Sequence, residues 1–170
     1  MIQYNQMINQ LNSKIRPSLK KSQQLLYYII QSKDKVEDKT KLAKLQYFAD
    51  FIHYAFHGQP ISQQEIIYTK QKQGLLSRNF TDDIEVLKLS GLIDETSKYN
   101  YVIKKKVNIS LSNEEIRTVQ YVLKKYGDLS YSDLVGICHS QVPYLATKEG
   151  AIAEFFTAYN LVDEYKDYAG

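Results

Sequence analysis

The chain has 170 residues, of which 44% are apolar and 24% charged, and this composition excludes a disordered protein and suits a single folded domain. Its formal net charge of +3 is too small to indicate a nucleic-acid partner by itself. The chain has a single cysteine, and residues 1–11 show no apolar leader. No apolar run is long enough to cross a bilayer. We therefore expect a cytoplasmic protein without a membrane segment.

The N-terminal end is predicted to stand apart from the rest. Apolar residues recur at roughly helical spacing over residues 1–17 and stop at Pro17, which does not fit inside a helix. We therefore expect an N-terminal arm or short helix at 1–17 and one helical domain over 18–170, since no repeat or linker divides the remainder. Ser18 can cap a second helix, which a solvated turn over residues 32–39 follows.

The strongest helix is predicted over residues 40–57, beginning at Thr40 and ending before Gly58 and Pro60. Two neighbouring faces of this helix are apolar, and such a helix is packed on several sides, so we expect it to be the central helix of the fold. The second face suits either the core or an interface anchor, and we prefer the core. The first stripe comprises Leu42, Leu45, Phe48, Ala49, Ile52 and Phe56, and the second Tyr47, Phe51 and Tyr54.

The middle of the chain combines an ambiguous segment with a helix and a hairpin. Residues 61–74 fit either a short helix or a strand, and this choice stays open. A helix is expected to begin at Thr81 and end at Gly91, and residues 92–105 then form a two-stranded hairpin. A helix followed by such a hairpin is also typical of a winged-helix module.

The C-terminal part is predicted to be helical again. Ser112 and Glu115 form a capping box at the start of a helix that Gly127 closes. A shorter helix begins at Ser130 or Ser132. A last helix carries Ile152, Phe155, Phe156, Tyr159 and Val162. The predicted fold class is therefore mainly α, a single helical domain around a central hydrophobic helix with a small β-hairpin.

Several separated segments match one known family in the right order. Residues 41–51 read KLAKLQYFADF, which is similar to the T-K-L-x-K-L-x-Y-F-A-D-F helix of Panacea domains, and residues 58–61 read GQPI, like their G-x-P-I turn. Residues 111–130 resemble the family's L-S-x-E-E helix and Y-G-x-x-S turn, and residues 139–144 resemble its H-x-x-x-P-W ending. The chain thus resembles the SocA-like Panacea antitoxins over about residues 20–150.

This resemblance implies a small cytoplasmic antitoxin, often encoded on a phage or another mobile element, that neutralises a cognate toxin or other partner protein by direct binding. In at least one type of the family the antitoxin also presents the toxin to a Clp-type protease. We expect no enzymatic activity, no cofactor and no metal, and the sequence leaves a homo-oligomer open. The family-matching residues expected to be structural are Leu45, Tyr47, Phe48, Asp50, His139, Pro143 and Tyr144.

The partner-binding surface is predicted around the loop at residues 71–80 and the hairpin at 92–104, with a few aromatic or aliphatic side chains as anchors. Two departures from the family bear on this prediction. First, Leu75 follows Gly74 where many members have a Gly-Pro pair, and the loss of this proline is expected to change which partner the loop binds. Second, Tyr144 replaces a tryptophan. The predicted contact residues are Leu75, Leu76, Arg78, Phe80, Tyr99 and Tyr101.

Two residue pairs raise the question of a chemical site. His53 and His57 stand one helical turn apart, as two zinc ligands do, but Tyr54 occupies the place of the glutamate in an H-E-x-x-H site. Cys138 precedes His139, yet adjacent helical residues point about 100° apart and do not face each other. We therefore interpret the histidines and the cysteine as structural.

DNA binding stays open as a second function. Lys104, Lys105 and Lys106 follow the hairpin, where a winged-helix protein contacts phosphates. Lysines at a strand end also commonly keep an exposed edge from aggregating, and the net charge is modest. We therefore prefer protein binding and keep a winged-helix-like DNA-binding regulator as the alternative.

Overall fold

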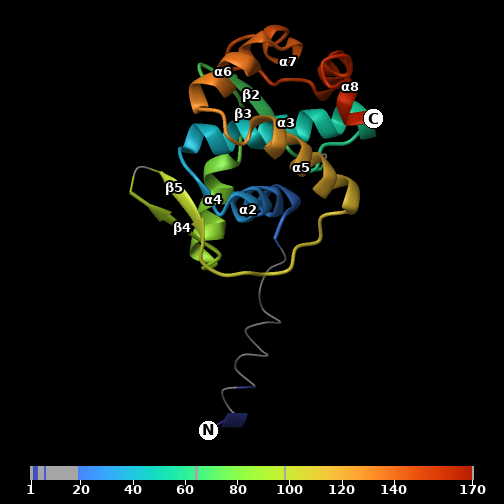
Figure 1. The fold of residues 1–170 in the computed structure, drawn as a ribbon. Coiled ribbons are helices and arrows are strands. Elements are labelled where there is room, and N and C mark those ends of the chain that lie inside the picture. The colour runs from blue at the N-terminus through green and yellow to red at the C-terminus, as the bar shows by residue number, and fades with distance from the viewer. Residues whose placement is uncertain (1, 4–5, 7–18, 64, 98, 170) are drawn as a thin grey trace.

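The computed structural model describes residues 2–3, 6, 19–63, 65–97 and 99–169, and over these residues the chain is mainly helical, as predicted (Figure 1). Most of the predicted arm at 1–17, and Ser18, lie outside the described residues. The helices are α2 (Lys21–Lys33), α3 (Lys39–His57), α4 (Phe80–Leu89), α5 (Asn113–Tyr126), α6 (Tyr131–Ser140), α7 (Val142–Leu145), the 3₁₀ helix η1 (Phe155–Leu161) and α8 (Lys166–Ala169). The strands are β1 (Lys35–Val36), β2 (Tyr68–Gln71), β3 (Gly74–Ser77), β4 (Ile93–Thr96) and β5 (Asn100–Ile103).

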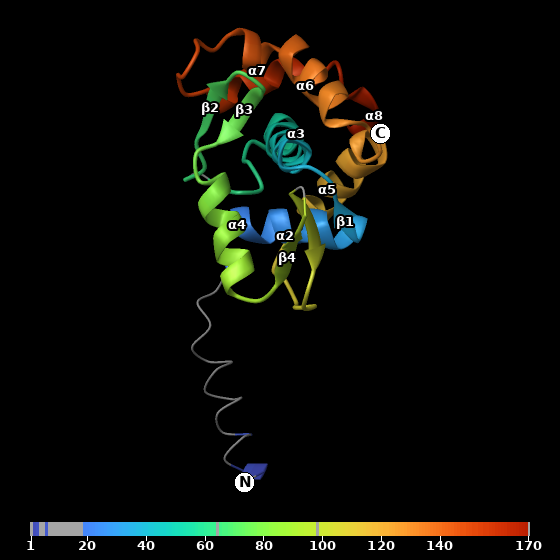
Figure 2. The same ribbon diagram turned by 90° about the vertical axis from the view of Figure 1, so that its left-hand side faces the viewer.

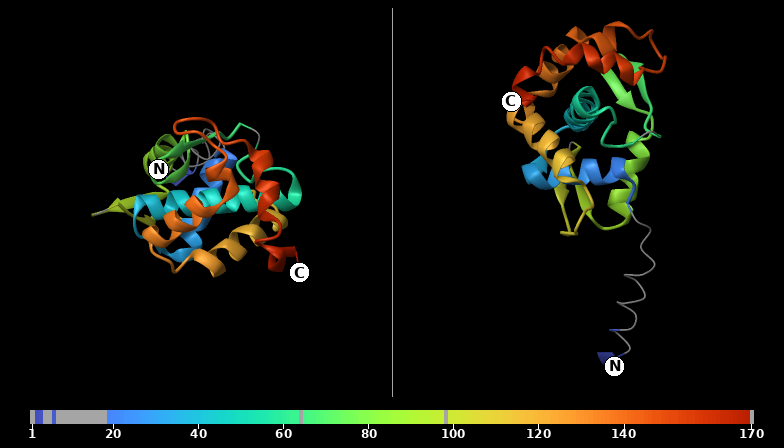
Figure 3. Two further views of the ribbon diagram at one scale, coloured as in Figure 1. Left: turned by 90° about the horizontal axis from the view of Figure 1, so that it is seen from above. Right: turned by 90° about the vertical axis from the view of Figure 1, so that its right-hand side faces the viewer.

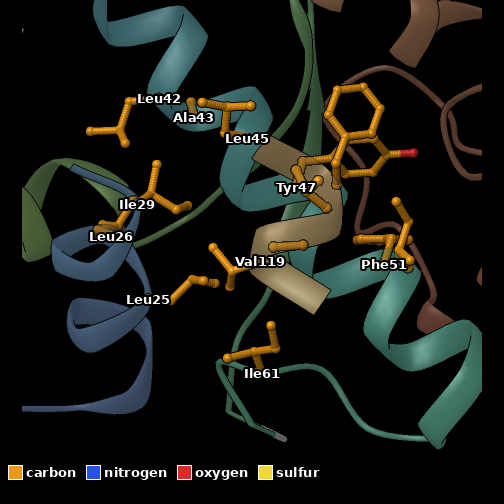
Figure 4. Packing of buried hydrophobic residues seen from close by; sticks show 14 of the residues in the cluster. Leu25, Leu26, Ile29, Leu42, Ala43, Leu45, Tyr47, Phe51, Ile61 and Val119 are labelled. Atoms are coloured by element: carbon orange, nitrogen blue, oxygen red, sulfur yellow. The ribbon is translucent and has the colours of Figure 1, made fainter. Parts of the chain in front are cut away.

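Helix α3 passes through the middle of the molecule, as predicted, and the other elements surround it. Figure 2 and the right panel of Figure 3 look nearly along its axis, with α2 on one side and α6 and α7 on the other. Figure 4 shows side chains of α2 and Val119 of α5 packed beside it. Tyr47 and Phe51 of the second apolar stripe are fully buried, so they belong to the core. None of the described helices is long and apolar enough to cross a membrane.

Side chains that accept from free backbone N–H groups set the starts of α3, α5 and α6. Helix α3 begins one residue before the predicted cap Thr40, because the Asp38 carboxylate accepts from the N–H groups of Thr40 and Lys41 at 2.6 and 3.2 Å. The predicted capping box at the start of α5 is confirmed. There the Ser112 N–H donates to the Glu115 carboxylate at 2.8 Å, and the Glu115 N–H donates to the Ser112 hydroxyl at 3.1 Å.

The predicted hairpin at residues 92–105 is confirmed as β4 and β5, and it gains a third strand. Strand β1 lies within residues 32–39, which were expected to form a solvated turn, and it pairs antiparallel with β5 to give the sheet order β1-β5-β4. Lys35 lies opposite Val102 and Val36 opposite Tyr101. A strand of two residues is too short to show a periodic pattern, and its pairing partner is distant in the sequence.

The ambiguous segment at residues 61–74 enters a second hairpin, β2 and β3. Residues 150–153 cover the edge of β2 that faces away from β3. The Lys70 N–H donates to the Ala151 oxygen at 3.0 Å, and the Ala153 N–H donates to the Tyr68 oxygen at 2.9 Å. The last predicted helix is found only in part: Ile152 is not helical, because the backbone here already pairs with β2. A 3₁₀ helix, η1, follows instead.

The elements α2, β1, α3, α4, β4 and β5 have the connectivity of a winged helix-turn-helix domain, in which the first strand pairs with the last. Residues 58–79, with the β2–β3 hairpin, are inserted between its second and third helices. Figure 1 shows the β4–β5 hairpin projecting beside α4. In the order of elements α4 corresponds to the recognition helix of DNA-binding members of the class, and its main packing partner is α2.

Candidate functional site

Helix α4 begins at Phe80, one residue before the predicted cap Thr81, and one of its faces packs against α2. Gln23 of α2 donates to the Asp83 carboxylate at 3.1 Å, and burial raises the pKa of Asp83. The apolar residues on this buried face are Phe80, Ile84 and Leu87. These contacts hold α4 firmly and leave its opposite face to solvent.

The exposed face of α4 is acidic and carries one large apolar side chain. Asp82, Glu85 and Leu89, which we call the α4 ridge, recur at i, i+3 and i+7 and therefore share a face. Leu89 is 84% exposed. Lys88 donates to Glu95 of β4 at 2.8 Å and to Glu85 at 3.0 Å, and these bonds raise the pKa of Lys88. The one cation of the helix is thus held by two carboxylates.

Tyr99 lies at the tip of the β4–β5 hairpin, beside the last pair, Thr96 and Asn100. It is 61% exposed, and its φ of 59° lies in the left-handed region. This conformation costs a residue with a side chain about 1–2 kcal/mol, and strain of this kind concentrates at functional positions. The turn of the hairpin therefore carries an exposed aromatic ring at a position with a local backbone cost.

Three of the six predicted contact residues are core residues in the structure. Leu75, Phe80 and Tyr101 are at most 1% exposed, because β3, α4 and β5 turn these positions inward, so they offer a partner no surface in this fold. Leu76 is partly buried and lines a hollow of about 400 Å³ between the start of α3 and the β2–β3 turn. Arg78 and Tyr99 are exposed. The predicted surface is thereby reduced to Leu76, Arg78 and Tyr99.

The departure from the family at Gly74-Leu75 lies where β3 packs on α3 and α6. The buried ammonium group of Lys44 donates to the Leu75 backbone oxygen, and the buried Cys138 thiol lies beside Gly74. Gly74 has a φ of 116°, and a Cβ there would lie 2.9 Å from the Lys44 Nζ. Desolvation lowers the pKa of Lys44 to about 8. This edge of β3 is therefore occupied by side chains of the core.

Asp50, in the family-like part of α3, is fully buried and fastens the segment before β2. Its carboxylate accepts from the Ser62 N–H and hydroxyl, both at 2.8 Å, and from the Tyr68 hydroxyl at 2.7 Å. Desolvation raises its pKa to about 6, although these hydrogen bonds act in the opposite direction. The other buried family-matching residues of this helix are Leu45, Tyr47 and Phe48.

The segment around Pro143 connects α6 and α7 and packs against β2. The rings of His139 and Tyr144 stack with centroids 4.2 Å apart. Lys70 of β2 lies 4.0 Å from the Tyr144 ring centroid and donates to the backbone oxygens of Tyr144 and Thr147 at 3.1 and 2.9 Å. Tyrosine in place of the family's tryptophan thus still supplies a ring that packs on both sides.

His53 and His57 stack with centroids 4.3 Å apart, and each ring is also engaged by another helix. The His53 Nδ1 lies 2.7 Å from the Thr118 hydroxyl, and the His57 Nε2 lies 2.8 Å from the Tyr168 hydroxyl. Desolvation, together with His57, lowers the pKa of His53 to about 4. In the part of the chain that the structure describes, no group of three or more potential metal ligands occurs. The pair ties α3 to α5 and α8.

The three lysines after the hairpin lie at its base rather than at its tip. The Lys104 Nζ is 3.7 Å from the Asp94 carboxylate, and the backbone N–H groups of Lys104 and Lys105 donate to the Leu92 oxygen at 2.9 and 3.3 Å. The side chains of all three lysines are exposed. They therefore lie at the opposite end of the hairpin from Tyr99.

Sequence reasoning missed two exposed groups. The α4 ridge has a signal in the sequence, the i, i+3, i+7 spacing of two acids and a leucine. The second group has no such signal, because its exposure depends on the bridge to β2 and on the 3₁₀ helix η1 that follows it. Its members, which are between 48% and 63% exposed, are Leu145, Ile152, Phe156 and Tyr159.

The fold and this surface define a mainly helical domain with winged-helix connectivity and an exposed face that is acidic and apolar. The family described as "Antitoxin SocA-like, Panacea domain" matches residues 42–145. This span is more than half of the chain, so the protein belongs to the SocA-like Panacea family, as the sequence resemblance predicted. The search of curated proteins and the search of solved structures gave no match.

Proposed function

We propose that this protein is an antitoxin that neutralises a cognate toxin, or another partner protein, by direct binding in the cytoplasm. Membership of the SocA-like Panacea family is the observation that carries this proposal. Exposed large apolar side chains support a protein partner, since Leu89, Leu145 and Phe156 are each more than 60% exposed and would be buried in an interface. The proposal includes no catalysis, cofactor or metal.

The surface that we assign to the partner combines Leu76, Arg78 and Tyr99 with the α4 ridge. Leu76 offers an apolar wall of the hollow beside α3, and Tyr99 offers an amphipathic ring, which is typical of interface anchors. Binding there would act by covering the working surface of the partner. Presentation of the bound partner to a Clp-type protease would be a second step.

Co-expression with the product of an adjacent gene tests the proposal. We expect the adjacent product to arrest growth when expressed alone, and this chain to restore growth and co-elute with it in size-exclusion chromatography. If growth stays arrested while both proteins accumulate, the antitoxin assignment is wrong. Repeating the co-expression in a strain without Clp protease tests the second step, because the level of the partner should then rise.

A winged-helix-like DNA-binding regulator is the second candidate, and the connectivity from α2 to β5 favours it. For this function, affinity for the protein's own promoter should fall steeply with salt. Replacing Lys104, Lys105 and Lys106 with alanine should reduce the salt slope by about 1 for each phosphate that is no longer neutralised. Absent or salt-insensitive binding in fluorescence anisotropy would remove this candidate.

A further inference from the structure

The α4 ridge stands at the recognition-helix position of the winged-helix connectivity, but its charge has the wrong sign for DNA. A helix that reads DNA presents arginine or lysine to the phosphates and base edges. Helix α4 presents Asp82 and Glu85 instead, and its one lysine, Lys88, is occupied by Glu85 and Glu95. Phosphate groups would therefore be repelled by this face.

The acidic surface continues from α4 onto Glu95 of the neighbouring strand β4. The Lys88 bond to Glu95 joins the strand to the helix, whereas Asp94 lies on the opposite face of the strand, where Lys104 is 3.7 Å away. Figure 2 shows α4 and β4 side by side on the face turned to the viewer. The acids of this surface are therefore Asp82, Glu85 and Glu95, and Lys88 is the one basic residue that α4 and β4 contribute to it.

An apolar side chain stands within this acidic surface. Leu89 continues the ridge one turn beyond Glu85, is 84% exposed and makes the C-terminal end of α4 apolar. Because Phe80, Ile84 and Leu87 fix the other side of the helix in the core, the ridge is held in place before a partner binds. Such preorganisation lowers the entropy lost on association.

We propose that the α4 ridge, with Tyr99 at the hairpin tip, is the docking surface for a partner protein whose contacting face is basic and has an apolar socket for Leu89. This inference rests on the proposed function and adds to it the face that is used and the chemistry of the partner. The acids steer and orient a basic partner, Leu89 supplies the apolar area buried beside the base of the hairpin, and Tyr99 supplies a second anchor at its tip. The helix that corresponds to the recognition helix would thus bind a protein instead of DNA.

The product of the adjacent gene is the probe, and its affinity is measured by isothermal titration at several salt concentrations. The variant D82K/E85K should bind at least about 10-fold more weakly, with a smaller salt dependence, because steering by charge is reversed. The control D128K/D133K makes the same change of charge on exposed residues at the turn between α5 and α6, outside α4, the hairpin and the exposed apolar side chains named above, and should bind as the wild type does. A second variant, L89S, leaves the charges unchanged and should also bind at least about 10-fold more weakly. Circular dichroism confirms that each variant is folded.

The outcomes separate this inference from the proposed function. If the wild type does not bind the adjacent product, both are wrong. If the wild type binds and D82K/E85K and L89S bind equally well, the protein has its partner but docks it elsewhere, and only the present inference fails. If the wild type binds promoter DNA and D82K/E85K strengthens that binding well beyond what the charge-matched control does, the face belongs to DNA and the inference is likewise overturned.

Discussion

Helices α3 and α4 are the second and third helices of the same winged-helix connectivity, yet their surroundings differ sharply. Helix α3 is buried on nearly every side and carries even Lys44 and Asp50 into the core. Helix α4 buries one face and leaves two acids and Leu89 in solvent. A buried polar group must keep its partners, whereas an exposed one can be exchanged at little cost. Stability is therefore concentrated around α3, and α4 is free to carry specificity.

The largest expected difference between the two helices concerns a single large side chain on each. Phe51→Ala should lower the free energy of unfolding by about 3–5 kcal/mol, because a fully buried ring that stacks on Phe155 at 4.6 Å leaves a cavity. Leu89→Ala is the control and should change it by no more than about 0.5 kcal/mol. Urea denaturation measures both. Similar losses in the two variants would contradict the contrast between α3 and α4.

The second prediction concerns the pH dependence of stability that α3 imposes. The pKa of Asp50 is raised from 3.8 to about 6, so its protonation stabilises the folded state as the pH falls from about 6 to 4. The pKa of His53 is lowered from 6.5 to about 4, so the unfolded chain takes up this proton first and acidification over the same range destabilises the fold. In the wild type the two effects oppose each other.

Single variants should separate these effects. When the pH is lowered from about 6 to about 4, the free energy of unfolding of Asp50→Asn should fall by on the order of 3 kcal/mol more than that of the wild type. The reason is that asparagine cannot take up the proton that stabilises the folded wild type. His53→Gln should lose less than the wild type over the same range. Denaturation curves at several pH values measure the slopes, and every other titrating group is common to the three proteins. Parallel curves for all three would show that neither group titrates as described.

The smallest expected effect lies at the hairpin tip. Tyr99→Gly should raise the free energy of unfolding by about 1 kcal/mol, because glycine adopts the positive φ of this position without strain. Tyr99→Ala, which keeps the strain and loses the ring, should bring no such gain. Thermal unfolding compares them, and both variants should bind the adjacent product more weakly. A glycine variant that is no more stable than the alanine variant would remove the argument from strain.

Elements with strong local signals were predicted well. Helix α3 follows from its two apolar stripes, and the start of α5 follows from the hydrogen bonds of Ser112 and Glu115, which involve neighbours in sequence. Strand β1 and the bridge from Ile152 to Thr69 were not predicted, because each depends on a partner far along the chain. The same limit explains Leu75, Phe80 and Tyr101, whose apolar side chains suit an anchor and a core position equally well.

The sequence by itself determined the family, the mainly helical class and the central place of α3, since motifs, caps and apolar periodicity are local properties of the chain. Only the tertiary structure decided which apolar residues remain outside. It buried Leu75 and Tyr101 and left Leu89 and Tyr99 in solvent, although all four are large and apolar or aromatic. The reason is physical, because exposure depends on which elements pack together and not on the residue itself. For this protein, that packing separates the face proposed for a partner from the core.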